Sequence, residues 1–284
     1  MRICYIDPTI KSFHCRYHYY WFMADACKNL FNCDIRYDLN KLDEYKWIIL
    51  GFGCFNELSF LQNFRCNSNI IIILNKEYTN LEQKLDIISR IKPQYCFTAY
   101  YAIEKLLPLK FQRLSFATSI NEFINNFDGK YIYDIGFTGI IRHEQDNNIR
   151  RRIINLLNKQ TDITVYYREN TGLPLDKYKQ LTQQTKIWLC TTGPADLVGT
   201  RYFEIMAMRR SLVLCNNKKH VYDNIFEDKV HCVMFNDELD FIEKLRYYLI
   251  NDNERKKIID NAYFHVIKNH DWSNRAQQII KCII

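Results

Sequence analysis

Short apolar runs alternate with helix-like segments along most of this chain of 284 residues, and this alternation restricts the fold more than any other feature. The clearest run, Ile70-Ile71-Ile72-Ile73-Leu74, has the length of a strand buried on both faces, and the helix-like segment 79–91 follows it. Strands that alternate with helices form parallel sheets covered by helices. We therefore expect an α/β protein with parallel sheets.

The same pattern gives the expected elements in chain order. The expected strands are 2–6, 34–37, 47–51, 70–74, 95–98, 113–116, 131–137, 163–167, 186–190, 211–215 and 230–235. The expected helices are 16–31, 57–63, 79–91, 100–107, 146–158, 174–184, 200–209, 237–250 and 252–269, with a last short helix in 273–284.

The alternation restarts once, after a polar segment that contains a glycine, Asn125-Asn126-Phe127-Asp128-Gly129-Lys130. A chain of this length also exceeds the usual size of one domain. We therefore expect two Rossmann-like domains, residues 1–128 and 129–272, followed by the terminal helix 273–284.

Composition narrows the class of protein. No apolar run approaches the ~20 residues that span a bilayer, and the first residues lack the apolar core of a signal peptide. The 11 cysteines form no C-x-x-C pair, and their odd number rules out complete internal pairing. A reduced, cytoplasmic protein is the expectation.

The formal net charge of +7 is too small to indicate nucleic-acid binding by itself. It suits a phosphate-bearing ligand, and equally a peripheral contact with an anionic membrane surface. We expect no nucleic-acid partner and no transmembrane segment.

A turn rich in glycine and threonine opens the helix expected from Thr200, with Asp196 before it and Glu204 inside its first turns. The unpaired N–H groups and the positive dipole end of a helix N-terminus suit a diphosphate. A carboxylate one turn further in can accept hydrogen bonds from ribose hydroxyls. This layout is that of a nucleotide-sugar site.

A second group of residues follows the strand 131–137. Gly136-Phe137-Thr138-Gly139 forms a small turn, and Arg142 and the run Arg150-Arg151-Arg152 come after it. Successive arginines on a helix point in different directions, so one or two of them can face a ligand. The turn lacks the G-x-G-x-x-G spacing, and nothing in it supports NAD binding.

The order of these motifs also carries a resemblance. Asp196 and Glu204 enclose seven residues, which resembles the E-x7-E element of GT-B glycosyltransferases with Asp in the first position. Arg201-Tyr202-Phe203-Glu204-Ile205-Met206-Ala207 and the later His270-Asp271-Trp272-Ser273-Asn274-Arg275 are similar to segments of group-1, family-4-like glycosyltransferases of the spore-maturation type. The resemblance covers roughly residues 134–280 well and the first half loosely.

This resemblance implies the GT-B fold, with a cleft between the two Rossmann-like domains and a C-terminal helix that crosses back onto the first domain. It implies a glycosyltransferase that moves a hexosyl or related sugar from a nucleotide-diphosphate-sugar donor to a glycan, lipid or protein acceptor. Retention at the anomeric carbon is suggested, although the Asp in the first position leaves it open.

The resemblance also assigns roles to residues. The implied donor-binding residues are Gly139, Arg142, Arg150, Arg168, Gly193, Gly199, Thr200, Arg201 and Glu204. Among them Thr200 and Arg201 meet the diphosphate, and Arg168, at a strand end, meets the base. Glu204 holds the ribose, and the helix dipole predicts a low pKa for its carboxyl group.

The implied catalytic candidates are Asp196 and His14, the second as an acceptor base. His14 and His18 have the spacing of metal ligands, but no carboxylate partner accompanies them, so we expect no metal and no cofactor. His270-Asp271-Trp272 we interpret as a structural elbow before the last helix.

Three alternatives stay open. The first is an exostosin-like or other glycosyltransferase on the same fold. The second is a non-catalytic module that binds sugar nucleotides or glycans, since the chain is short and has only 8 glycines. The third, a nucleic-acid-binding protein that uses the three arginines, lacks a recognisable fold for that task.

Overall fold

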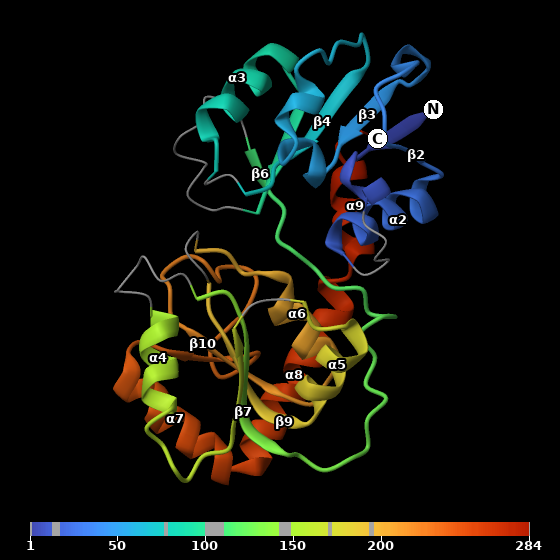
Figure 1. The fold of residues 1–284 in the computed structure, drawn as a ribbon. Helices are drawn as coiled ribbons and strands as arrows, with labels where there is room; N and C mark the ends of the chain where they lie inside the picture. The colour runs from blue at the N-terminus through green and yellow to red at the C-terminus, as the bar shows by residue number, and fades with distance from the viewer. Residues whose placement is uncertain are drawn as a thin grey trace. The chain divides into compact units, whose positions relative to one another are not determined.

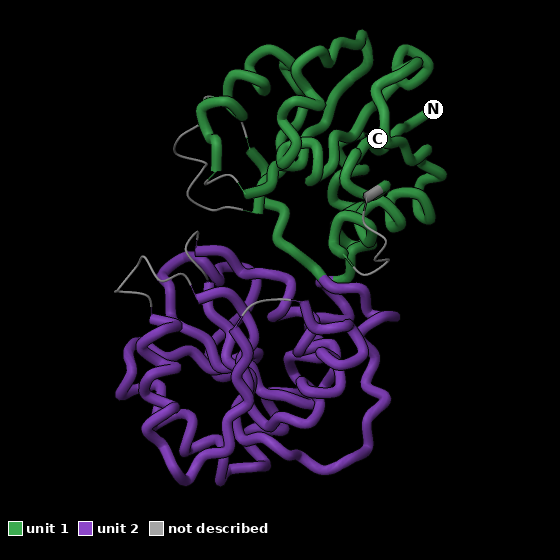
Figure 2. The backbone as a smooth tube through the Cα atoms, viewed as in Figure 1, with its two compact units in different colours: residues 1–117, 271–284 green, residues 118–270 purple. Residues whose placement is uncertain are grey.

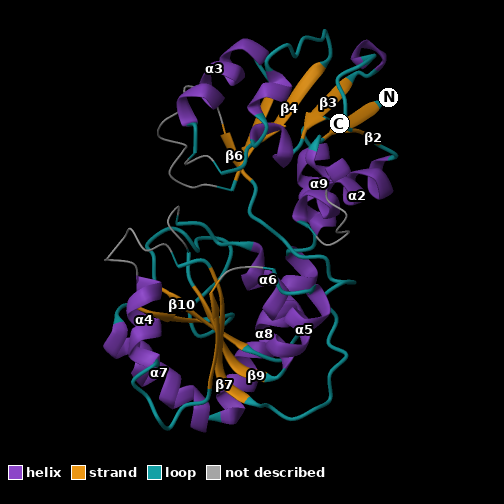
Figure 3. Cartoon of the chain, in the orientation of Figure 1, coloured by secondary structure: helices purple, strands orange, loops and turns teal. Residues whose placement is uncertain are grey.

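The computed structural model describes residues 2–12, 18–76, 79–99, 111–141, 149–169, 172–192 and 196–283. The chain forms two compact units, unit 1 with residues 1–117 and 271–284, and unit 2 with residues 118–270 (Figure 2). Each unit contains one parallel β-sheet with helices packed on it (Figures 1 and 3). The predicted α/β class with parallel sheets is confirmed.

The described residues of unit 1 form six parallel strands in the order β2-β1-β3-β4-β5-β6. The strands are β1 (Ile3–Ile6), β2 (Asp34–Arg36), β3 (Trp47–Leu50), β4 (Asn69–Ile73), β5 (Tyr95–Thr98) and β6 (Phe111–Arg113). The helices are α1 (Thr9–Ser12), α2 (Tyr19–Phe31), α3 (Leu81–Ile91) and α9 (Trp272–Ile280), with 3-10 turns η1 (Leu42–Glu44), η2 (Phe52–Phe55) and η3 (Leu58–Leu61). The isoleucines of β4 are buried at the sheet centre, as strands covered on both faces require.

Among the described residues of unit 1, two expected elements differ from the structure, and the helix expected at 100–107 lies outside these residues. The segment expected as helix 57–63 forms only the short 3-10 turn η3. The strand expected at 113–116 is β6, which ends at Arg113, because its pairing with β5 starts at Phe111 opposite Cys96.

The last helix, α9, belongs to unit 1 and packs against α2. Asp271 caps its first turn, accepting a hydrogen bond from the Ser273 amide at 2.8 Å within a capping box. Trp272 then packs on the aromatic rings of Tyr19, Phe52 and Phe116. The elbow 270–272 is therefore a helix start with an aromatic anchor, as its structural interpretation had it.

In unit 2, the part of the chain that the structure describes forms five parallel strands in the order β11-β10-β9-β7-β8. The strands are β7 (Tyr133–Gly139), β8 (Val165–Glu169), β9 (Thr185–Cys190), β10 (Leu212–Asn216) and β11 (Val233–Phe235). The helices are α4 (Ile149–Leu157), α5 (Leu175–Gln183), α6 (Thr200–Ala207), α7 (Glu238–Ile250) and α8 (Asp252–Asn269).

The side chains of β9 alternate between the two faces of this sheet. Ile187 and Leu189 join the apolar cluster beneath α4 and α7, while Trp188 meets the Tyr178 ring of α5 on the other face. Figure 1 shows α4 and α7 on one side of the sheet and α5, α6 and α8 on the other. The sheet is thus covered on both faces, and its strand ends are held in place.

The units divide after residues 117 and 270, whereas the sequence interpretation divided the chain after 128 and 272. The polar segment before Gly129 does not mark the division, because the residues just before it are fastened to α5. Lys179 donates to the carboxylate of Glu122 at 3.0 Å, and the Gln183 amide donates to the carbonyl oxygen of Ile124 at 3.4 Å.

Candidate functional site

The candidate residues of unit 2 gather where β7, β9 and β10 end. Strand β7 ends at Gly139, next to the end of β9 at Cys190, and helix α6 begins close by at Thr200. Ligands of open parallel sheets bind at the carboxyl ends of the strands. The expected helix start at Thr200 is confirmed, with Gly199 in extended conformation as its N-cap.

Arg150 reaches this edge from the first turn of α4. Its Nε and Nη2 atoms donate to the hydroxyl of Thr191 at 2.8 and 2.7 Å, and Nη1 donates to the carbonyl oxygen of Ile140. Its guanidinium also lies 5.3 Å from the centre of the Phe137 ring. Burial lowers the pKa of Arg150, and the nearby positive charge of Arg201 lowers it further.

Arg201 reaches the same edge from the first turn of α6. Its Nη1 atom donates to the carbonyl oxygen of Thr138, and its Nε atom is buried without a hydrogen-bond partner among the described residues. Gly139 has a φ of +157°, and a Cβ there would lie 3.3 Å from Nη1 of Arg201. Glycine therefore lets this guanidinium approach the strand end closely.

Two guanidinium groups thus share one sheet edge. Protein oxygens hold each of them, the Thr191 hydroxyl and the Ile140 carbonyl for Arg150 and the Thr138 carbonyl for Arg201. Like charges held this close repel one another, and a bound dianion relieves that repulsion. The chemistry of this pair is that of a phosphate or diphosphate site.

Glu204 lies one turn further along α6 and is partly buried. The hydroxyl of Tyr178, on α5, donates to its Oε2 atom at 3.0 Å. The side chain of Thr200 also hydrogen-bonds to this carboxyl group, and the charge of Arg201 acts on it. The carboxylate is therefore fixed at the start of α6, where it can accept further hydrogen bonds.

The expected low pKa of Glu204 is wrong in direction. Burial raises the pKa of this carboxyl group, and Arg201, Thr200 and Tyr178 oppose that rise only in part. The helix dipole acts within an exposed first turn, whereas α6 packs its first turns against β9 and α5.

Asp196 lies in the chain between β9 and α6. It has a left-handed backbone with a φ of 48°. Its Oδ1 atom accepts a hydrogen bond from the hydroxyl of Thr192 at 3.3 Å and pairs with Nζ of Lys218, also at 3.3 Å. About half of each side chain of this ion pair is exposed, 47% for Lys218 and 48% for Asp196, so both groups are open to a ligand.

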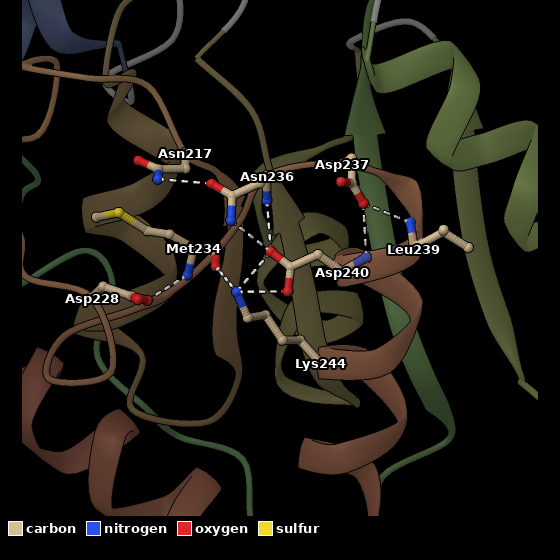
Figure 4. A network of polar contacts seen from close by, with 8 residues as sticks. All are labelled: Asn217, Asp228, Met234, Asn236, Asp237, Leu239, Asp240 and Lys244. Atoms are coloured by element: carbon tan, nitrogen blue, oxygen red, sulfur yellow. Dashed lines mark hydrogen bonds and ion pairs between the residues drawn. The ribbon is translucent and has the colours of Figure 1, made fainter.

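The residues around Lys218 are firmly held. The Asn216 side chain accepts a hydrogen bond from the Thr192 amide at 3.0 Å. Asn217 donates its side-chain amide to Asn236 at 2.9 Å, and Asn236 in turn bonds to Asp240 (Figure 4). In this network Lys244 pairs with Asp240 and donates to the carbonyl oxygen of Met234, while Asp237 caps α7. The network fixes the ends of β10 and β11.

The remaining predicted residues contribute less, or lie outside the described part. Arg168 is exposed on β8, opposite Thr138 in the sheet register, and Gly199 leaves open space where a Cβ would stand. His14, Arg142 and Gly193 lie outside the described residues.

The sequence interpretation did not include Tyr178, Thr191 or Lys218. Each of them contacts a predicted residue from a different element, and no spacing motif connects it to that residue. Within the described ranges no three His, Cys, Asp or Glu side chains are grouped to hold a metal ion. None of the described helices is long and apolar enough to cross a membrane.

Comparisons with known proteins agree with this geometry. Residues 148–281 match the model of a family described as glycosyl transferase-like. A search of the curated proteins gave no match.

Three solved structures show the breadth of the structural likeness. Anabaena HepE in complex with UDP-glucose is 10% identical with a TM-score of 0.68, and the match covers 100% of this chain and 99% of that one. An α-glucosyltransferase in complex with UDP-glucose and DNA containing an abasic site is 9% identical with a TM-score of 0.65 over 100% and 99% of the chains. TarM is 13% identical with a TM-score of 0.64, over 91% of this chain and 57% of that one.

The chain therefore has the GT-B fold of two Rossmann-like domains and carries a glycosyl transferase-like domain. Residues 148–281 thus resemble glycosyltransferases in sequence, and the chain resembles GT-B glycosyltransferases in fold. The finer likeness to the spore-maturation type stays a prediction.

Proposed function

We propose that this protein transfers a sugar from a nucleoside-diphosphate donor bound by unit 2. The observation that carries the proposal is the meeting of Arg150, Arg201 and Glu204 at the carboxyl ends of β7 and β9. The two cations suit a diphosphate, and the carboxylate beyond them suits the two hydroxyls of a ribose.

Uracil is the proposed base. HepE and the α-glucosyltransferase are both described in complex with UDP-glucose, and both match this chain over its full length. We therefore propose a UDP-sugar as donor, with the exposed Arg168 near its base.

The chemistry follows from the charges at the site. Breaking the bond between the sugar and the diphosphate leaves negative charge on the departing phosphate. Arg150, Arg201 and the N–H groups of the first turn of α6 are placed to stabilise that charge. These groups support a reaction that requires no metal ion, and turnover that persists in excess EDTA is the expected result.

Asp196 is the proposed partner of the sugar itself. Its spacing from Glu204 in the sequence favours retention of configuration at the anomeric carbon. NMR of the first product formed measures the anomeric configuration and tests this proposal. His14 keeps its proposed role as an acceptor base. The proposed acceptor is a glycan, lipid or protein. We propose no nucleic-acid partner. One structural neighbour is described in complex with DNA, so transfer of sugar to DNA by this protein is the result that would contradict this proposal.

A cytoplasmic location is also proposed. Buried cysteines such as Cys190 and Cys215 are free thiols. Burial raises the pKa of the Cys190 thiol, which makes it unreactive.

Two measurements test the proposed function. Calorimetry with UDP and UDP-glucose should show binding, and release of UDP from UDP-glucose should follow when acceptor pools are added. Binding without release in every pool would favour a non-catalytic sugar-nucleotide module. Absence of UDP, GDP and dTDP binding would overturn the nucleotide site itself.

A further inference from the structure

One hydrogen bond joins the two helices that border the proposed ribose site. Tyr178 lies on α5, and its hydroxyl donates to Oε2 of Glu204 on α6 at 3.0 Å. Burial raises the pKa of the Tyr178 hydroxyl well above its usual range, so the group is a neutral donor over all pH values of interest. A hydrogen bond from a neutral donor to a carboxylate is among the stronger ones in proteins.

The ring that carries this hydroxyl has little freedom. Only 9% of Tyr178 is exposed, and the edge of Trp188 meets its ring with centroids 6.2 Å apart at 80°. On another side Phe123 meets it at 6.5 Å, also at 80°. The neighbouring Lys179 fastens α5 to Glu122. The packing therefore fixes the Tyr178 hydroxyl in one position relative to Glu204.

The groups facing Glu204 come from three elements. Thr200 and Arg201 approach it from its own helix α6, Tyr178 approaches from α5, and the thiol of Cys190 lies near it on β9. Arg201 also donates a hydrogen bond to the carbonyl oxygen of Thr138. Among the described residues, Tyr178 thus directs the carboxylate by a hydrogen bond from outside α6.

We propose that Tyr178 is a positioning residue for the donor ribose: its hydroxyl holds one oxygen of Glu204 so that the carboxylate faces the ribose hydroxyls. This role rests on the proposed nucleotide site. It gives α5 a part in donor recognition that no sequence motif assigns, with a uridine diphosphate as the ligand class.

Tyr178→Phe removes the hydroxyl and keeps the ring between Trp188 and Phe123. The Glu204 carboxylate then loses a hydrogen-bond donor, so the side chain can adopt more rotamers and the carboxyl group ionises less readily. UDP should bind about tenfold more weakly. The 2′,3′-dideoxy analogue of UDP lacks the hydroxyls that Glu204 would accept from, so its affinity should stay within about twofold of that for the unchanged protein.

The pH profile gives a second readout that a structural role would not move. Loss of the Tyr178 donor raises the pKa of Glu204 further, so the ribose-dependent part of UDP binding should be lost at higher pH than in the unchanged protein. Calorimetry with UDP and dideoxy-UDP from about pH 5 to about pH 9 measures this part as the difference between the two binding free energies. The titration of the phosphates cancels in this difference, because both ligands carry the same phosphates.

Tyr202→Phe is the matched control. It removes a buried tyrosine hydroxyl on α6 whose partner, 3.0 Å away, is the hydroxyl of Tyr222. This variant should leave both affinities and the pH profile unchanged, and melting curves of both variants establish that they are folded.

The outcomes separate the two proposals. If the unchanged protein does not bind UDP, or binds UDP and dideoxy-UDP equally, the proposed ribose site fails. If Glu204→Gln abolishes the preference for the ribose while folded Tyr178→Phe keeps both the preference and the pH profile, the ribose site stands and the positioning role of Tyr178 is overturned.

Discussion

Arg201, in the first turn of α6, donates a hydrogen bond to the carbonyl oxygen of Thr138 on β7. This bond spans the end of the sheet and brings the guanidinium next to Arg150, whose own anchor is the hydroxyl of Thr191. Oxygen atoms of Thr191 and Thr138 thus hold the two guanidinium groups at the same edge of the sheet. Two cations at one edge suit an anionic ligand.

Arg150→Ala and Arg201→Ala should each weaken UDP binding by about 1–3 kcal/mol, the scale of a hydrogen bond to a charged group. Isothermal titration calorimetry measures the effect. The control is Arg152→Ala on the same helix α4, because Arg152 pairs with Glu238 at 2.9 Å. Unchanged affinity in both site variants, or an equal loss in the control, would remove the diphosphate from this edge.

Glu204→Gln should weaken binding of UDP by about 1–3 kcal/mol and leave binding of its 2′,3′-dideoxy analogue nearly unchanged. The pH dependence has a definite sign. Because burial raises the pKa of Glu204, its carboxylate is lost at a higher pH than that of an ordinary glutamate. UDP binding by the unchanged protein should therefore weaken with falling pH sooner than an ordinary glutamate would cause, and Glu204→Gln should remove that part of the profile.

Much of the fold could be predicted from the sequence, because the local sequence pattern of many elements agrees with their tertiary environment. The isoleucines of β4 are apolar on both sides, as a covered strand requires, and the helix expected at Thr200 begins at Thr200. The polar segment around Gly129 led to a wrong domain boundary, because Glu122 and Ile124, just before it, bind α5 and belong to unit 2. Polarity alone does not distinguish a linker from a segment that lies on a surface.

The candidate site was predictable only in part. Arg201 and Glu204 belong to one helix, so their spacing is visible in the sequence. Tyr178 and Lys218 reach the site from other elements, and their partners are set by the order of the strands and not by sequence distance. The direction of the Glu204 pKa shift depends on burial, which the dipole argument does not contain.

Asp196→Asn should lower sugar transfer while leaving UDP affinity within about twofold, because the proposed partner of Asp196 is the sugar and not the nucleotide. Lys218→Ala should reduce transfer less, since an exposed ion pair contributes about 0–1 kcal/mol. Lys219→Ala, at the next exposed lysine, is the control. Initial rates with UDP-glucose, compared with UDP titrations, measure the two effects separately. A parallel loss of UDP affinity in Asp196→Asn would place this residue on the nucleotide instead.

The last prediction concerns stability and three histidines of unit 2. The His231 ring lies 4.1 Å from the His265 ring, and the Nε2 atoms of His265 and His270 are 3.0 Å apart. Burial, with a smaller contribution from His265, lowers the pKa of His231 to about 4. Its Nδ1 atom accepts a hydrogen bond from the Glu227 amide at 3.1 Å, which requires that nitrogen to be unprotonated.

An unfolded histidine takes up its proton near pH 6.5, about the ordinary value, whereas folded His231 does so only near 4. Between these values the unfolded state binds more protons, so the free energy of unfolding should decrease as the pH falls from about 6.5 to about 4 and should not change from this group above 6.5. His231→Asn keeps an acceptor for the Glu227 amide but cannot titrate, so its urea midpoint should fall less over this range. His220→Asn is the matched control, because His220 is exposed and pairs with Asp223 at 3.0 Å. Equal acid sensitivity of the unchanged protein and His231→Asn would show that this buried imidazole does not contribute to the acid limit of stability.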